Sequence, residues 1–260
     1  MNDEIIYHID PAAEDLNNPV MIVGLPGVGH VGKFVADHLV EVLGAQKIIE
    51  IYSDHFPPQV MVGEDSTVTL VGNRVYLAKT EKTDLLILAG DSQSTDPAGH
   101  YSLCETYIGF ASQFKVKRIF TLGGYPTGIV NTENYVIGAV NNKEMVEPLK
   151  EKGIKFSPSE PPGGIVGASG LILAFAQLRG IDAACLMGST TGYIADPLSS
   201  KELLGKLCGI LEIEVDFAAL DEKIKDMEQM VEKIKDSVTG EEFENYGVRP
   251  SADEDLNYFG

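Results

Sequence analysis

The feature that most constrains the fold is a repeated alternation of short apolar segments with helix-forming ones. Residues 20–24 (VMIVG) are an apolar, β-branched run, and residues 31–43 have the spacing of an amphipathic helix. Residues 84–90 (DLLILAG) are almost wholly apolar, which is typical of a central strand covered on both faces. Residues 118–123 and 135–140 are expected to be further central strands. This alternation predicts an α/β fold, a mostly parallel sheet with helices on both faces.

One segment interrupts the alternation. Residues 61–62 and 67–71 alternate around the polar residues 64–65, which predicts an antiparallel hairpin. The preceding loop at residues 55–58 (HFPP) is expected to be kinked and exposed, and to form a contact with another subunit or partner. The sequence therefore predicts a β-hairpin region inserted into the α/β domain.

A glycine-rich turn joins the first apolar segment to its helix. It reads G-x-P-G-x-G-x-x-G and consists of Gly24, Pro26, Gly27, Gly29 and Gly32. Its form matches the dinucleotide fingerprint, in which N–H groups at a helix N-terminus face a pyrophosphate. However, Pro26 lacks an N–H and stiffens the turn, and the same glycines would permit tight packing of the helix on its strand. A nucleotide site and a structural turn both stay open.

Small polar residues follow the second apolar strand, at the edge where α/β sheets bind ligands. They are Asp91, Ser92, Gln93 and Asp96, and side chains of this kind can cradle a phosphate or a sugar. They form the rim of an alternative site of the phosphorylase or hydrolase type. Asp96, followed by Pro97, also has the chemistry of a helix N-cap. The nucleophile-elbow pattern G-x-S-x-G is absent, which weakens the enzyme reading.

Charge and cysteine content bound the partners and the compartment. The chain has 39 Asp and Glu against 20 Lys and Arg, a net charge of −19. A surface this acidic repels nucleic-acid phosphates and anionic lipid headgroups, so neither nucleic-acid nor membrane binding is expected. The three cysteines are scattered without a C-x-x-C, which favours reduced thiols in a cytoplasmic protein. No metal and no cofactor are predicted.

The character of the sequence changes after a helix at residues 201–211. We expect residues 1–212 to form the α/β domain. Residues 213–240 have apolar side chains at alternating spacings of three and four, which predicts a coiled-coil-like helix that contacts its own chain or another subunit. A helix laid on the domain is the alternative. Residues 241–260 are acidic and polar, and are expected to form a flexible tail. The apolar seam consists of Phe217, Leu220, Ile224, Met227, Val231, Ile234 and Val238.

The tail ends in two aromatic residues, in the order Tyr258, Phe259, Gly260. An apolar tip on an acidic segment suggests a docking peptide for another protein, and we assign partner binding to these three residues. Packing of the tip onto its own domain is the alternative. No catalytic residue is predicted.

Several segments together resemble one known family. Residues 24–32 (GLPGVGHVG) resemble the strand-to-helix turn that opens the proteasome assembly chaperone type 2 family. Residues 84–93 are similar to its apolar strand followed by G-x-x-Q, residues 123–125 to its strand-G-G segment, and residues 163–171 to its glycine-rich helix start. These segments keep the family's order and spread over residues 20–192. The chain is identified as an archaeal-type member.

The resemblance implies a three-layer α/β/α sandwich, akin to nucleoside phosphorylases, that forms homo-oligomers. It implies an ATP-independent chaperone or adaptor that binds proteasome α-subunits or the α-ring. Some members end in a hydrophobic-tyrosine-any motif that inserts between α-subunits, and here Phe259 stands where that motif has tyrosine. We therefore predict a homo-oligomeric chaperone that docks partly through its tail. The alternative is a nucleotide- or nucleoside-binding enzyme that uses the Gly24–Gly32 loop.

Overall fold

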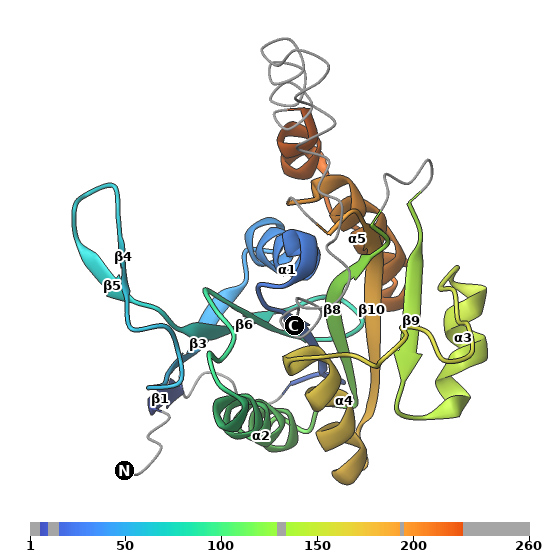
Figure 1. Ribbon diagram of the computed structural model, residues 1–260, viewed down its shortest axis with the longest axis horizontal. Helices are drawn as coiled ribbons and strands as arrows, with labels where there is room; N and C mark the ends of the chain where they lie inside the picture. The colour runs from blue at the N-terminus through green and yellow to red at the C-terminus, as the bar shows by residue number, and fades with distance from the viewer. Residues whose placement is uncertain (1–5, 10–15, 129–133, 193–194, 226–260) are drawn as a thin grey trace.

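The computed structural model describes residues 6–9, 16–128, 134–192 and 195–225 (Figure 1). Within these residues the strands are β1 (Ile6–Ile9), β2 (Val20–Gly24), β3 (Gln46–Tyr52), β4 (Val60–Val62), β5 (Val68–Leu70), β6 (Asn73–Ala78), β7 (Leu85–Gly90), β8 (Arg118–Pro126), β9 (Val136–Val140) and β10 (Asp182–Thr190). Eight of them form one sheet in the order β1-β3-β6-β7-β2-β8-β10-β9, and β4 pairs with β5 in a second sheet.

The middle of the large sheet is parallel. Strand β2 lies between β7 and β8 and pairs parallel with both, and β8 pairs parallel with β10. Antiparallel pairings join β1 to β3, β3 to β6, β6 to β7 and β9 to β10. Strand β3 therefore points the same way as the central four, and five of the eight strands that the structure describes in this sheet share one direction. The prediction of a mostly parallel sheet is confirmed.

Strand β9 lies at an edge of the sheet, antiparallel to β10, so the prediction that residues 135–140 form a central strand was wrong. Its outer side is covered by a single bridging residue. The backbone N–H of Gly138 donates to the carbonyl of Lys155, and the N–H of Lys155 donates to the carbonyl of Val136, both at 2.8 Å. Since Val136 and Ile137 are also buried, this edge strand has the apolar composition of an interior one.

Helices cover both faces of the large sheet (Figure 1). They are α1 (Val31–Val42), α2 (Pro97–Gln113), α3 (Val146–Glu151), α4 (Ala168–Leu178) and α5 (Pro197–Leu211), with short 3-10 turns η2 (Val28–His30) and η3 (Lys143–Met145). Alternate residues of β7 point to opposite faces. Leu88 packs in one core with Tyr107 of α2, and Ile87 packs in the other with Leu39 of α1. Helix α4 joins the first core and α5 the second, which confirms the three-layer α/β/α sandwich.

The predicted hairpin is present and stands away from the body (Figure 1). Strands β4 and β5 pair antiparallel, with Val60 opposite Leu70 and Val62 opposite Val68. The segment leaves the large sheet at the end of β3 and returns to it at β6, two strands that are neighbours in that sheet. We call residues 60–70 the hairpin arm.

The segment after α5 begins by packing on the domain. Residues 218–225 are helical, and Leu220 and Ile224 are buried, with Leu220 in the same core as α1 and α5. Phe217 is partly buried against that core. The carbonyl oxygen of Asp216 lies 2.6 Å from Nε2 of His38 on α1. The first seam positions thus contact their own domain, and the rest of the predicted coiled-coil-like helix falls outside the described residues.

Candidate functional site

The carboxyl ends of β2, β7, β8 and β10 meet at one edge of the sheet, because these four strands are parallel neighbours. The glycine loop follows β2, and the Asp91 rim follows β7. The structure thus brings together the two regions that the sequence marked as candidate ligand sites. Their geometry decides what each can do.

The glycines let α1 lie in backbone contact with β8. A Cβ atom on Gly32 would lie 2.2 Å from the carbonyl oxygen of Leu122. A Cβ on Gly24 would lie 2.2 Å from the carbonyl oxygen of Gly32 itself, and one on Gly124 would lie 2.3 Å from that of Val28. No side chain fits at such distances without moving the backbone. This packing favours the structural reading of the loop.

Side chains and N–H groups of the protein hold the carbonyls of the loop. Gly29 is in the left-handed region at φ +61, and its carbonyl accepts from the N–H of Asp196 at 2.8 Å. The amide Nε2 of Gln93 donates to the carbonyl of Pro26 at 2.7 Å. The Oε1 atom of the same amide accepts from the N–H of Ala168, the first residue of α4, at 3.0 Å. Gln93 therefore links the glycine loop to the start of α4.

Asp91 and Ser92, which precede Gln93, also form hydrogen bonds within the protein. The Oδ2 atom of Asp91 accepts from the guanidinium of Arg74 at 3.0 Å and from the N–H of Gly72 at 3.2 Å. Burial alone would lower the pKa of Arg74, but the hydrogen bond and charge of Asp91 outweigh it and raise that pKa. The hydroxyl of Ser92 donates to the carbonyl of Gln93 at 2.7 Å.

Asp96 caps α2. Its Oδ1 atom accepts from the N–H of Gly99 at 2.9 Å, and Pro97 occupies the first turn, which confirms the capping interpretation. Its Oδ2 atom lies 2.7 Å from Nδ1 of His55. The N–H of Gly99 first, and the imidazole of His55 second, hold the pKa of Asp96 below its ordinary value. Asp96 thus fixes both a helix start and the loop that leads to the hairpin arm.

All four rim side chains therefore bind groups of the protein itself, and they hold loops together at the strand ends. Tyr258, Phe259 and Gly260 lie outside the described residues. Within the described part of the chain, no group of three or more His, Cys, Asp or Glu is placed to bind a metal ion. None of the helices there combines the length and the apolar character needed to cross a bilayer.

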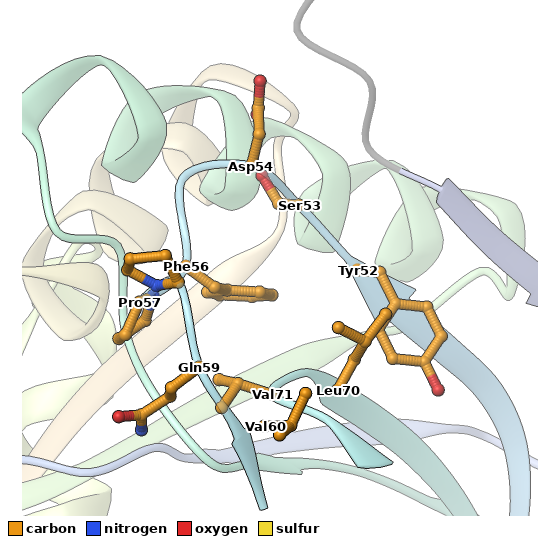
Figure 2. A pocket seen from close by; sticks show the side chains of 10 residues that line it. Tyr52, Ser53, Asp54, Phe56, Pro57, Gln59, Val60, Leu70 and Val71 are labelled. Carbon is orange, nitrogen blue, oxygen red and sulfur yellow. The ribbon is translucent and has the colours of Figure 1, made fainter. Parts of the chain in front are cut away.

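An apolar groove lies at the base of the hairpin arm (Figure 2). Phe56, Pro57 and Pro58 of the loop that the sequence marked as a contact region line it, but the hollow itself was not predicted. It has a cavity volume of about 810 Å³. Phe56 is buried beneath it, so the prediction of an exposed loop at residues 55–58 was wrong for this residue, because its ring joins the core on the α2 side. The lining residues are Tyr52, Ser53, Asp54, Phe56, Pro57, Pro58, Gln59, Val60, Leu70 and Val71.

The sequence model of the PAC2 family matches residues 21–235. The chain belongs to the PAC2 family. The match spans the glycine loop, the rim, the hairpin arm and the large sheet apart from β1 and the first residue of β2, so these belong to the part of the chain that the family shares.

Three known proteins match this chain over almost its whole length. The crystal structure of Pyrococcus furiosus PbaB, described as an archaeal proteasome activator, superposes with a TM-score of 0.82 at 36% identity, covering 90% of this chain and 100% of that one. An uncharacterized Methanocaldococcus jannaschii protein, MJ1210, is 39% identical over 95% of this chain and 94% of its own length. P. furiosus PbaA, described as an archaeal homolog of proteasome-assembly chaperone, matches with a TM-score of 0.76 at 22% identity, over 90% and 92% of the two chains. The PbaA match shows the fold alone.

Proposed function

We propose that this PAC2 family protein is a homo-oligomeric, ATP-independent chaperone or adaptor that binds proteasome α-subunits or the α-ring. The observation that carries the proposal is the similarity to PbaB, an archaeal proteasome activator, at 36% identity over that protein's full resolved length. Similarity at this level over a whole domain makes a shared type of partner the best-supported function. The family match over residues 21–235 supports the same assignment.

The geometry of the strand ends supports a protein-binding role over the enzyme alternative. A nucleotide site in the Gly24–Gly32 loop needs room for phosphate against the glycines. Gly24 and Gly32 are instead within van der Waals reach of neighbouring backbone, and the carbonyls of Pro26 and Gly29 accept from the protein's own donors. The proposal therefore includes no catalytic step.

The proposal assigns part of the binding to Tyr258 and Phe259. Burying an aromatic side chain contributes about 2–3 kcal/mol, and the ordering of a polar tail cancels part of that gain. A single tail would bind weakly, whereas several tails on one oligomer would bind by avidity. Self-association of the body is thus part of the mechanism.

Co-sedimentation with proteasome α-rings tests the proposal. We expect the full chain to sediment with the rings, and removal of Tyr258, Phe259 and Gly260 to weaken this binding. Asn257→Ala is the matched control, because it alters the tail next to the aromatic pair without removing an aromatic ring. Binding that is undiminished after the deletion would remove the tail from the mechanism, and failure of the full chain to bind would refute the proposal itself.

A further inference from the structure

The hairpin arm presents an apolar face that the body does not cover. Cross-strand partners and alternate residues of an antiparallel pair lie on the same face. Val60, Val62, Val68 and Leu70 therefore share one face, and they are 46%, 70%, 62% and 58% exposed. Met61 and Thr69 share the opposite face. Four large apolar side chains gathered on one projecting face mark an interaction site.

The arm is also a small sheet on its own. A two-stranded hairpin is only marginally stable in water unless it packs against something else. Strands β4 and β5 pair with each other and with no other strand that the structure describes. Packing of the apolar face against another surface would supply the missing cover.

The groove at the base of the arm is continuous with this face. Val60 and Leu70 belong to both, since they form the base pair of the arm and line the groove. In Figure 2 they gather with Phe56 and Val71, whereas Asp54 points away from them. Among the described residues that line the groove, Asp54 is the only charged one. Apart from Asp54, the face and the groove together form an uncharged surface, raised at the tip of the arm and hollow at its base.

The net charge of the chain indicates what kind of molecule can cover the apolar face and groove. The chain carries a net charge of −19, so a basic partner would be matched by a surface rich in carboxylates. The apolar face offers none, although Glu64 and Asp65 stand at the turn between the two strands. A second copy of the chain brings an equally acidic surface, and the repulsion between the two copies is smallest where both surfaces carry little charge. The apolar face and groove meet that condition.

We propose that two copies of the chain pair through their hairpin arms. In a two-fold arrangement each surface meets the same surface of its partner, so a raised end must fall on a hollow end. Val62 and Val68 of one copy then cover the groove of the other, next to Tyr52 and Pro57. This pairing deepens the proposed function, which requires an oligomer, by naming the surface that builds it.

The first experiment measures the mass of the full-length particle by light scattering. The double variant Val62→Asp/Val68→Asp is expected to lower the mass twofold, because each arm pairing is lost. The control Met61→Asp/Thr69→Asp adds the same two charges to the same strands on the opposite face, and its mass is expected to equal that of the unaltered protein. An unaltered protein that is monomeric, or a particle of full mass with Val62→Asp/Val68→Asp, overturns the proposal.

The second experiment uses cross-linking to test whether the tip of one arm, at Val62, lies over the groove of the other copy. The three native cysteines are buried, so an introduced surface cysteine is the reactive one. A mixture of Val62→Cys and Gln59→Cys proteins treated with a short bismaleimide is expected to yield more cross-linked dimer than a mixture of Thr69→Cys and Gln59→Cys. Equal yields overturn the arrangement.

The α-ring assay separates this inference from the proposed function. If Val62→Asp/Val68→Asp keeps the full mass but no longer co-sediments with α-rings, the apolar face belongs to the client interface, and the arm pairing is wrong. If the unaltered protein does not bind α-rings at all, the proposed function fails, while the mass measurement still decides the arm pairing.

Discussion

The imidazole Nδ1 of His55 lies 2.7 Å from the carboxylate Oδ2 of Asp96, and this contact joins the loop after β3 to the first turn of α2. A second contact runs beside it, since the N–H of Thr95 donates to the carbonyl of His55 at 2.9 Å. The hairpin arm begins shortly after this loop, at Val60. The direction in which the arm leaves the body is therefore set by a cap on α2.

Replacing Asp96 tests this double role. Asp96→Ala removes both the cap and the partner of His55, so we expect a lower urea midpoint. Asp96→Asn keeps an acceptor for the N–H of Gly99 and is expected to lose less. Since the pKa of Asp96 is depressed in the folded state, its carboxylate stabilises the protein above the ordinary value of 3.8. That contribution disappears as the pH falls through the depressed pKa, and the Asn variant should lack this part of the acid transition.

Two glycines in helices, Gly32 of the glycine loop and Gly109 of α2, give a matched pair of substitutions. Gly32→Ala places a Cβ 2.2 Å from the carbonyl oxygen of Leu122, so we expect the free energy of unfolding to fall by about 1–3 kcal/mol. Gly109→Ala lies on the exposed side of α2, with no atom within 4 Å of the added Cβ, and should raise it by roughly 0.5–1 kcal/mol. Urea unfolding of both variants measures the difference. Two substitutions of equal effect would contradict the close packing of α1 on β8.

The segment after α5 contributes to stability through Leu220, which is fully buried. We expect Leu220→Ala to reduce the free energy of unfolding by about 2–5 kcal/mol, as other buried leucines do. Glu222→Ala, in the same helical turns but exposed, should change it by less than about 0.5 kcal/mol. A small effect of Leu220→Ala in thermal or urea unfolding would show that these turns do not pack on the domain in solution.

The three free cysteines should resist thiol reagents in the folded protein. Burial raises the pKa of Cys104 to about 12, and that of Cys185 and Cys208 to about 11, from the ordinary value of 9.0. We expect little reaction with a maleimide at pH 8 and three reacted thiols in denaturant. The thiols keep their protons to higher pH in the folded protein than in the unfolded one. Their contribution to the free energy of unfolding is therefore complete below pH 9.0 and declines as the pH rises toward 11. Rapid labelling of the native protein at pH 8 would contradict the burial.

Local sequence signals predicted the central elements well. The apolar run that contains Ile87 is recognisable because both faces of its strand are covered, and the dipeptide Asp96-Pro97 predicts a helix start through capping chemistry. The same chemistry recurs at Asp196-Pro197, where α5 begins four residues before the predicted start at residue 201. That signal was present in the sequence but was not used.

The elements that sequence reasoning missed depend on distant partners. Strand β1 pairs with β3, more than 35 residues away, and four residues alone carry too little pattern to reveal it. The edge position of β9 depends on its bridge to Lys155. The rim residues were predicted to gather at the strand ends, and they do. However, their partners Arg74, His55 and Ala168 come from other segments, so spacing could not distinguish a ligand site from an internal brace.

The hairpin arm leaves and re-enters the large sheet at two strands that are already neighbours, so it is an insertion that the sheet does not need for its own register. Changing the length of the arm, or placing charged residues on its surface, would leave the sandwich and its strand-end braces unchanged. The number of subunits and the choice of partner could therefore change among related proteins through substitutions confined to residues 60–70, while the α/β domain stays the same.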